Sequence, residues 1–345
     1  MTTTASVADR SVPLDVPLTV ELYVAAARRL GWSARILDPE FSYLWELDDG
    51  ASPRRAIVGA KLPVNDAAAT EIATDKYYQG VVLGTHGIRA PRSVRCLSPR
   101  RYGVGTYADR VGVEPGLAFA REHGFPLVVK PNALSHGIGV RRVDDEAELI
   151  DGVEALFPLD DVVLVQELVF GREFRFDLLD GELLVAYERG ALAVTGDGRS
   201  TLRELLERTD RRFAAPSTRA ERVHELEATK TFATLRRDGL TLDSVVPEGR
   251  TFDFSRGITN LNRCATSTRL DAIPAPWLAW CRRLGEVLHL RWFGVDLRVS
   301  SLDADPSDAV VLEINASPLV NQLALTVGKE AAVDIHVKVL EALKR

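Results

Sequence analysis

Three oxygen-bearing side chains near the end of the chain have the types and spacing of a metal site. Asp296 interrupts the apolar segment GVDLR, and Glu313 and Asn315 are two residues apart in VLEINASP, so they share one face of a strand. Two carboxylates and an amide from adjacent strands suit Mg²⁺ that carries nucleotide phosphates. The alternative is a set of polar groups facing solvent, but an unpaired charge in an apolar strand is costly. The pattern therefore favours a metal site.

A lysine and a glycine-containing loop have the types expected of a phosphate site. Lys130 ends the apolar segment PLVVK, which fixes the direction of its ammonium group, and the loop PNALSHGIGV follows at once. Gly137 and Gly139 allow the backbone to approach a phosphate and to direct N–H groups toward it. The spacing matches neither a Walker A loop nor a Rossmann fingerprint. On its own, the segment is also consistent with a purely structural turn.

The segment VVLVQELVFGREF offers groups suited to a nucleoside. A predicted strand ends at Gln166 and Glu167 and continues through an apolar linker to a second acid, Glu173. The linker can present backbone N–H and C=O groups to an adenine edge, while a carboxylate accepts hydrogen bonds from ribose hydroxyls. A strand, turn and strand with exposed acids fits the segment equally well.

Periodicity predicts the elements that must position these residues. The predicted helices cover residues 19–30, 75–84, 116–123, 145–156, 200–207, 215–239, 276–289 and 331–343, and Ser200 is the expected N-cap of its helix. The predicted strands cover residues 33–37, 55–58, 126–130, 162–166, 173–179, 182–188, 192–194, 294–299 and 309–314. Residues 99–114 are expected to form a loop. The order indicates mostly antiparallel sheets in at least two lobes, and substrate sites commonly lie between lobes.

The composition excludes several classes of protein. A chain of 345 residues with 46% hydrophobic residues can build a large core or two to three lobes. The net charge of −6 and the scattered arginines argue against a nucleic-acid partner. No apolar run reaches membrane-spanning length, residues 1–12 lack a signal-peptide segment, and the three cysteines form no CxxC pair. We therefore expect a cytoplasmic protein without a membrane partner.

From about Thr74 onward the sequence resembles the ATP-grasp ligase superfamily, and it looks most like the ATP-grasp part of cyanophycin synthetases and bifunctional glutathione synthetases. The resemblance is carried by GREFRFDLLDGELLVAYERGALAVTGDGRSTLREL, then by GITNLNR, GVDLR and VLEINASP. It implies a mixed α+β and α/β protein with the ATP-grasp fold, in which two α+β lobes grip ATP. The expected divisions are a short α/β lobe at 1–74 and the ATP-grasp domain at 75–345, with the phosphate flap in 75–170 and the metal ligands in 171–345.

The resemblance also implies roles by position. Lys76 in TDKYY and Lys130 match two phosphate-contacting lysines, and Arg263 in NLNR matches an arginine that approaches an acyl phosphate; Lys130 and Arg263 are the implied catalytic residues. Asp296, Glu313 and Asn315 match the metal ligands, normally of two Mg²⁺ ions, with Mn²⁺ as a substitute. The other implied nucleotide contacts are Ser135, His136, Gly137, Ile138 and Gly139 in a flap over the phosphates, Glu167, Leu168 and Val169 at the adenine, Glu173 at the ribose, and Arg189 facing the triphosphate.

The implied activity is that of an ADP-forming carboxylate–amine ligase, which makes an amide through an acyl phosphate from amino acids or small peptides. Two departures concern the substrate side: Leu134 replaces a flap glycine, and Cys264 and Ala265 replace paired glycines after NLNR. The alternatives are a protein or carrier-protein acceptor, a carboxylate kinase, and a catalytically silent nucleotide-binding module. Homodimerisation is left open.

Overall fold

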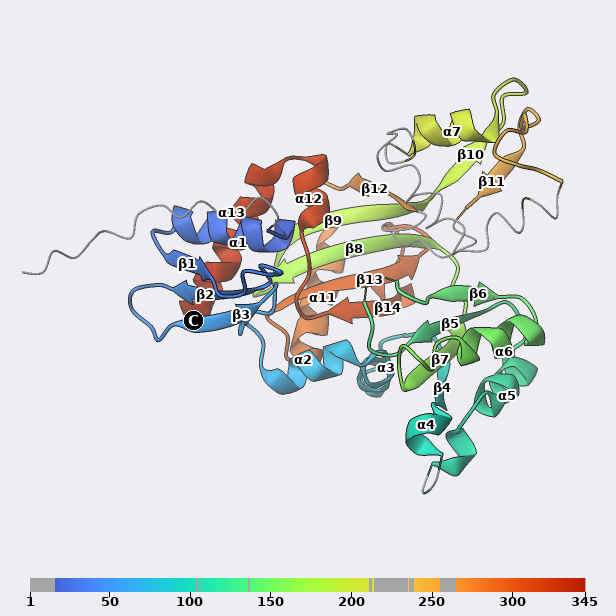
Figure 1. Cartoon of the computed structure of the whole chain (residues 1–345), viewed down its shortest axis with the longest axis horizontal. Coiled ribbons are helices and arrows are strands. Elements are labelled where there is room, and N and C mark those ends of the chain that lie inside the picture. Colours follow the sequence, from blue (N-terminus) through green and yellow to red (C-terminus); the bar gives the residue numbers. More distant parts are fainter. Residues whose placement is uncertain are drawn as a thin grey trace, which may run out of the picture.

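Alternating apolar and polar residues build four antiparallel sheets in the part of the chain that this computed structural model describes (Figure 1). The described residues are 16–103, 105, 107–135, 137–210, 213, 235, 239–254 and 265–344. The strands are β1 (Ser33–Ile36), β2 (Leu44–Asp48), β3 (Arg55–Val58), β4 (Ser93–Leu97), β5 (Leu127–Pro131), β6 (Arg141–Val143), β7 (Val162–Glu167), β8 (Arg172–Leu179), β9 (Glu182–Ala191), β10 (Ala193–Thr195), β11 (Thr251–Asp253), β12 (Ala265–Arg269), β13 (Trp292–Val299) and β14 (Val310–Asn315). The described α-helices are α1 (Leu18–Arg29), α2 (Ala67–Thr74), α3 (Lys76–Thr85), α4 (Pro99–Tyr102), α5 (Glu114–His123), α6 (Glu146–Glu154), α7 (Leu202–Thr209), α11 (Ala275–Leu288), α12 (Asn321–Thr326) and α13 (Lys329–Glu341).

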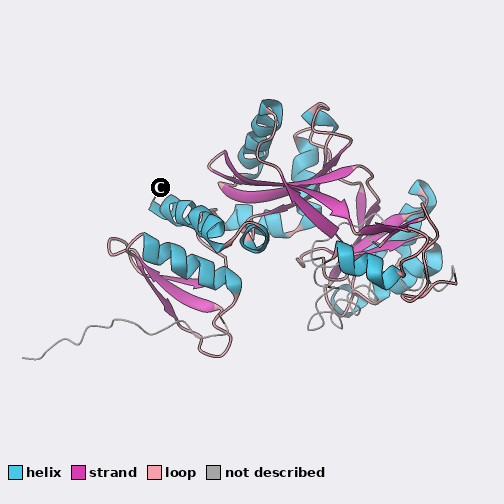
Figure 2. Cartoon of the chain, turned by 90° about the horizontal axis from the view of Figure 1, so that it is seen from above, coloured by secondary structure: helices cyan, strands magenta, loops and turns pink. Residues whose placement is uncertain are grey.

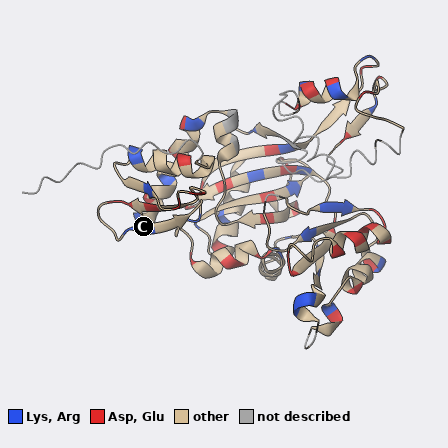
Figure 3. Ribbon diagram, viewed as in Figure 1, with Lys and Arg blue, Asp and Glu red and all other residues tan. Residues whose placement is uncertain are grey.

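The central sheet has five strands in the order β12-β9-β8-β13-β14, and β8 and β13 are almost wholly buried. Phe174 and Phe176 of β8 pack with Trp277 of α11 in a core that also includes residues of α2 and α3. Because successive side chains of a strand point to opposite faces, Glu173 and Arg175 lie on the other face. Figure 3 shows the charged residues that run along the strands of this sheet. The sheet thus has one apolar face in the core and one charged face for the site.

The second sheet has four strands in the order β4-β7-β5-β6 and packs against α5 and α6. Its core includes Leu117, Leu149 and Val165. All five residues of β5 are buried, and Lys130 is the last but one of them. Figure 1 shows this sheet, in green, beside the five-stranded sheet. Strand β5 therefore places Lys130 at the end of the four-stranded sheet that faces the five-stranded sheet.

The three-stranded sheet β1-β2-β3 shares a core with the last helices of the chain. Trp45 of β2 is fully buried, and its indole N–H donates to the carbonyl of Gly59 at 2.9 Å. Tyr23 of α1 and Leu340 of α13 belong to the same core. Figures 1 and 2 show α13 beside α1, far along the sequence but close in space. Residues from both ends of the described chain therefore build this lobe, while the predicted boundary at residue 74 stays a prediction.

Most predicted elements are confirmed with small shifts at their ends. The N-cap of α7 is Thr201, not Ser200: the Thr201 hydroxyl accepts from the Glu204 N–H, and the Glu204 carboxylate accepts from the Thr201 N–H. This capping box satisfies two otherwise unpaired donors, while the hydroxyl of Ser200 donates to Asp197. The prediction of a helix over residues 215–239 lies almost wholly outside the described residues.

One further prediction is corrected, and several elements were not predicted. The predicted loop at 99–114 begins with α4 and ends where α5 starts, since Pro99 and Pro115 occupy first-turn positions that tolerate the missing N–H. The sequence patterns also missed β2, β4, β6, β11, β12, α2 and α12. Helix α2 runs almost into α3, and Asp75 alone separates them because its carboxylate caps α3 at the Tyr78 N–H. No described helix combines the length and apolar character that crossing a bilayer requires.

Candidate active site

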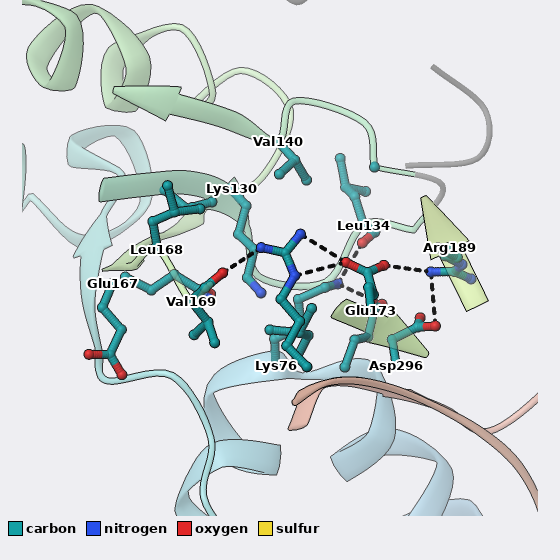
Figure 4. Close-up of a pocket in the computed structure, with 16 residues that line it drawn as sticks. Lys76, Lys130, Leu134, Val140, Glu167, Leu168, Val169, Glu173, Arg189 and Asp296 are labelled. Atoms are coloured by element: carbon teal, nitrogen blue, oxygen red, sulfur yellow. Dashed lines mark hydrogen bonds and ion pairs between the residues drawn. The ribbon is translucent and has the colours of Figure 1, made fainter. Parts of the chain in front are cut away.

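Residues from each of the predicted phosphate, nucleoside and metal sets meet at a pocket between the four-stranded and the five-stranded sheets (Figure 4). Strands β5 and β7 contribute side chains from one sheet, and β8, β9, β13 and β14 contribute side chains from the other. The first residue of α3 also reaches the pocket. The predicted residues that line it are Lys76, Lys130, Gly137, Glu167, Leu168, Val169, Glu173, Arg189, Asp296 and Glu313.

Lys76 joins the loop after β5 to the acidic strand β14. Its ammonium group donates to the Leu134 carbonyl at 2.6 Å and lies 3.3 Å from a carboxylate oxygen of Glu313. Asn132 helps to hold the start of α3, because its side-chain oxygen accepts from the Tyr77 N–H at 3.0 Å. The lysine is therefore fixed at the edge of the loop predicted to be the phosphate flap.

Lys130 is a buried cation close to a second one. The residue is 8% exposed. Burial and, to a smaller extent, the positive charge of Lys76 lower the pKa of its ammonium group to about 8, while Glu313 opposes the shift. A bound polyanion would remove the repulsion between the two lysines. The pair is thus suited to a polyphosphate.

Asp296 and Glu313 are directly paired across β13 and β14. Asp296 Oδ2 lies 2.9 Å from Arg175 Nη1. Asp296 Oδ1 lies 2.9 Å from Arg189 Nη1, but it is buried and accepts no hydrogen bond, since the ion pair lacks the required direction. A buried oxygen without a hydrogen bond is what a metal ligand offers before the metal binds. The two carboxylates therefore fit a hard cation.

Asn315, the third predicted ligand, is two residues beyond Glu313 on β14 and pairs with Gly294. It is not among the residues that line the pocket. Within the described part of the chain, no three His, Cys, Asp or Glu side chains form a metal-binding group. A cation between Asp296 and Glu313 would therefore need oxygens from Asn315, phosphate or water to complete its coordination.

Glu173 is held by two arginines. Its Oε2 accepts from Arg298 Nη2 at 3.0 Å and from Arg298 Nε at 3.1 Å, and its Oε1 accepts from Arg189 Nη1 at 3.2 Å. Arg189 also reaches Asp296, so one side chain connects the predicted ribose carboxylate with the predicted metal carboxylate. Figure 4 shows Glu173, Arg189 and Asp296 linked in this way.

Glu167 contributes backbone to the pocket, while its carboxylate points away from Lys130 and Glu173 (Figure 4). Arg92 donates to this carboxylate through Nη2 at 2.8 Å and Nε at 2.9 Å. Burial alone would raise the pKa of Glu167, but the hydrogen bonds and charge of Arg92 outweigh it and lower the pKa. Strand alternation instead turns the buried Gln166 toward the pocket. That alternation in VVLVQE could have identified Gln166 from the sequence.

No role was predicted for Arg175 and Asp177 from the sequence, although they alternate with Phe174 and Phe176 in the segment GREFRFD. Arg175 Nε donates to Asp177 Oδ1 at 2.6 Å, and both side chains are buried. Burial raises the pKa of Asp177, against the lowering effect of Arg175. A Cβ at Gly294 would lie 2.1 Å from Arg175 Nη2, so the absence of a side chain there makes room for this ion pair.

The loop that was predicted to be the phosphate flap reaches the pocket only in part. Gly137 lines the pocket with φ of +67°. Gly139 does not line it, and a Cβ there would lie 2.5 Å from Leu156, so this glycine serves packing. The other described flap residues outside the lining are Ser135 and Ile138, both exposed. His136 and Arg263 lie outside the described residues, so their predicted roles stay predictions.

Comparison with known proteins identifies relatives of this site. Residues 114–240 match the family model described as D-ala D-ala ligase C-terminus. Cyanophycin synthetase of Trichormus variabilis is 29% identical over 257 residues, which are 72% of this chain and 26% of the relative. The glutathione biosynthesis bifunctional protein of Lactiplantibacillus plantarum is 27% identical over 296 residues, which are 84% of this chain and 38% of the relative. The chain thus spans well under half of the length of these relatives.

A solved structure agrees with the sequence relatives. The bifunctional glutathione synthetase of Pasteurella multocida superposes with a TM-score of 0.51 and 20% identity, and the match covers 88% of this chain and 40% of that one. This likeness shows the fold. Together with the family match and the pocket between two α+β lobes, it confirms the predicted architecture. The chain therefore resembles the ATP-grasp ligases in sequence and shares their fold.

Proposed function

We propose that the protein is an ATP-dependent carboxylate–amine ligase that activates a small acid as an acyl phosphate and joins it to an amine. The observation that carries this proposal is the meeting of two lysines, Lys130 buried and Lys76 partly buried, with two strand-paired carboxylates in one pocket. The names of the relatives refer to cyanophycin and glutathione synthesis. By analogy with them, the proposed substrates are amino acids or small peptides.

The lysines carry the first half of the proposed reaction. A carboxylate that attacks the γ-phosphate of ATP brings two anions together, so both must be neutralised and aligned. Lys76 and Lys130 supply positive charge that is already oriented by the loop and by β5. Mg²⁺ held by Asp296, Glu313 and Asn315, as two ions or with Mn²⁺ in their place, would add Lewis-acid charge at the phosphate oxygens.

The second half of the proposed reaction is attack of the amine on the acyl phosphate. Arg263 is the proposed partner of the acyl phosphate and of the oxyanion that forms when the amine attacks. The loop that carries Leu134 and Gly137 would close over the phosphates and keep water from hydrolysing the intermediate. The alternative acceptor is a protein or a carrier protein. A cytoplasmic location and a homodimer are proposed from the sequence alone.

A catalytically silent nucleotide-binding module is the alternative from another class. Such a module is expected to lose a phosphate lysine or a metal carboxylate. In this chain Lys76, Lys130, Asp296 and Glu313 are all present and all line the pocket. This observation favours an enzyme over a silent module.

The test is release of ADP and phosphate from purified protein with Mg²⁺-ATP and pooled amino acids and small peptides. We expect release that requires both an acid and an amine, together with a condensed product in the mass spectrum. Release of ADP that needs only the acid, with the phosphoryl group retained in a stable acyl phosphate, would identify a carboxylate kinase instead. Tight ATP binding with no response in any pool would overturn the small-molecule substrates.

A further inference from the structure

Arg298 is a buried residue of the pocket to which the resemblance assigns no role. It is two residues beyond Asp296 on β13, so the two side chains share the charged face of the sheet. The residue is 7% exposed and lines the pocket. A buried charge is tolerated only when it is well paired. The groups that Arg298 binds therefore indicate its role in the pocket.

The guanidinium group of Arg298 binds two groups with predicted roles at the nucleoside. Nε and Nη2 donate to Glu173 Oε2 at 3.1 and 3.0 Å. Nη1 donates to the carbonyl oxygen of Val169. Because the guanidinium group is planar, its donors hold both acceptors in fixed directions.

These contacts also fasten the linker that connects the two sheets. Residues 168–171 run from the end of β7 to the start of β8. Gly171 has φ of +127°, and a Cβ there would lie 3.0 Å from the carbonyl oxygen of Val299. The linker backbone at Gly171 therefore lies directly against β13. The Arg298 side chain adds a second contact, its hydrogen bond to the Val169 carbonyl two residues earlier in the linker. The predicted adenine segment is thus positioned by the strand that also carries Asp296.

We propose that Arg298 is a positioning residue for the nucleoside end of ATP. It holds the Glu173 carboxylate toward the ribose hydroxyls and holds the linker backbone at Val169 in the conformation that receives the adenine edge. The proposed contacts of the triphosphate are Lys76 and Lys130. They are positioned independently of Arg298, Lys76 by its hydrogen bond to the Leu134 carbonyl and Lys130 by its place in β5. This inference rests on the proposed function. It predicts that loss of Arg298 weakens recognition of the nucleoside and spares recognition of the phosphates.

The experiment compares two ligands by calorimetry: Mg²⁺-ATP and Mg²⁺-tripolyphosphate, which lacks a nucleoside. For Arg298→Met we expect ATP affinity to fall about 10- to 100-fold, the range for losing charged hydrogen bonds. Tripolyphosphate affinity should change less than about twofold. The matched control is Arg172→Met, since Arg172, at the exposed start of β8, makes a similar two-point ion pair with Glu188. The control should bind both ligands as the wild type does.

A double-mutant cycle tests whether Arg298 acts through Glu173. If it does, Glu173→Gln combined with Arg298→Met will bind ATP no more weakly than the poorer single variant. Losses that multiply would contradict the proposed coupling. Equal weakening of ATP and tripolyphosphate, or unchanged ATP binding, would also overturn the inference.

Arg298→Lys decides the matter if Arg298→Met does not fold. Lysine keeps a buried positive charge beside Glu173 but cannot reproduce the planar set of donors. Weaker ATP binding with unchanged tripolyphosphate binding would support the inference, and equal changes would overturn it. Failure of the wild-type protein to bind ATP would instead contradict the proposed function itself, so the two failures are distinguishable.

Discussion

Near pH 8 the ammonium group of Lys130 is close to losing its proton, because burial and the charge of Lys76 lower its pKa to about 8. Only the protonated form attracts phosphate. Raising the pH from 7 to 9 is therefore expected to reduce the affinity for Mg²⁺-ATP about tenfold. Calorimetric titrations at pH 7, 8 and 9 measure this change.

Lys130→Met is the control for this pH dependence. The variant should bind ATP more weakly than the wild type at pH 7, and its affinity should be nearly constant up to pH 9. If the wild type shows the same flat profile, the lysine does not titrate in this range and the argument from burial fails.

Removing the Glu313 carboxylate tests the proposed metal site. Glu313 is paired with Asp296 across β13 and β14, and both residues line the pocket. Glu313→Ala is expected to lower Mg²⁺-dependent ATP turnover by at least about 100-fold, the usual result of removing one group that stabilises transferring phosphate. Glu46→Ala is the control, because it removes a carboxylate of β2 in the three-stranded sheet, outside the pocket, where Glu46 pairs with Arg35 of β1. Unchanged turnover in Glu313→Ala would refute the metal assignment.

At the scale of single elements, the sequence predicted which strands carry the site but not how their side chains pair. Alternation and motif likeness predicted Glu173 and Asp296 as site residues, and both line the pocket. The arginines Arg175 and Arg298 are in the same motifs, yet their roles depend on the register between β8 and β13. That register is set by tertiary packing, which no local pattern encodes. Glu167 is a similar case, because the direction of its carboxylate depends on Arg92, which directly precedes β4.

Gly294 provides a test of the packing within the central sheet. A Cβ there would lie 2.1 Å from Arg175 and 2.2 Å from Asp177, so Gly294→Ala must displace their buried ion pair. We expect the free energy of unfolding to fall by about 3 kcal/mol. Denaturant titration measures the change.

The matched control is Gly84→Ala in α3. A Cβ at this position meets no atom within 4 Å. Alanine is the better helix former, so stability should rise by up to about 1 kcal/mol. Equal stability of the Gly294→Ala and wild-type proteins would show that the ion pair has room to move.

At the scale of the whole molecule, the N-terminal lobe depends on the last long helix. Leu340 of α13 is fully buried in the core that contains Tyr23 and Trp45. Leu340→Ala is expected to lower stability by about 2–5 kcal/mol and to speed hydrogen exchange in α1 as well as in α13. Leu149→Ala, in the core of the four-stranded sheet, should speed exchange in α6 and leave α1 protected. Unchanged exchange of α1 in Leu340→Ala would contradict the shared core.

This long-range packing explains what the sequence left unpredicted about the lobes. The pattern of α1 predicts an amphipathic helix but does not say which element covers it. Arg29 of α1 pairs with Asp334 of α13, about three hundred positions away. A contact of such separation follows from the whole fold and leaves no local pattern.

The central claim is that the γ-phosphate is transferred to a carboxylate of the substrate. Once the screen identifies an acid and an amine, the acid labelled with ¹⁸O in its carboxyl group tests this claim most directly. An acyl phosphate intermediate predicts one ¹⁸O atom in each phosphate released, detected by mass spectrometry. Phosphate that carries no label would contradict the account, because it would mean that water, and not the acid, received the phosphoryl group.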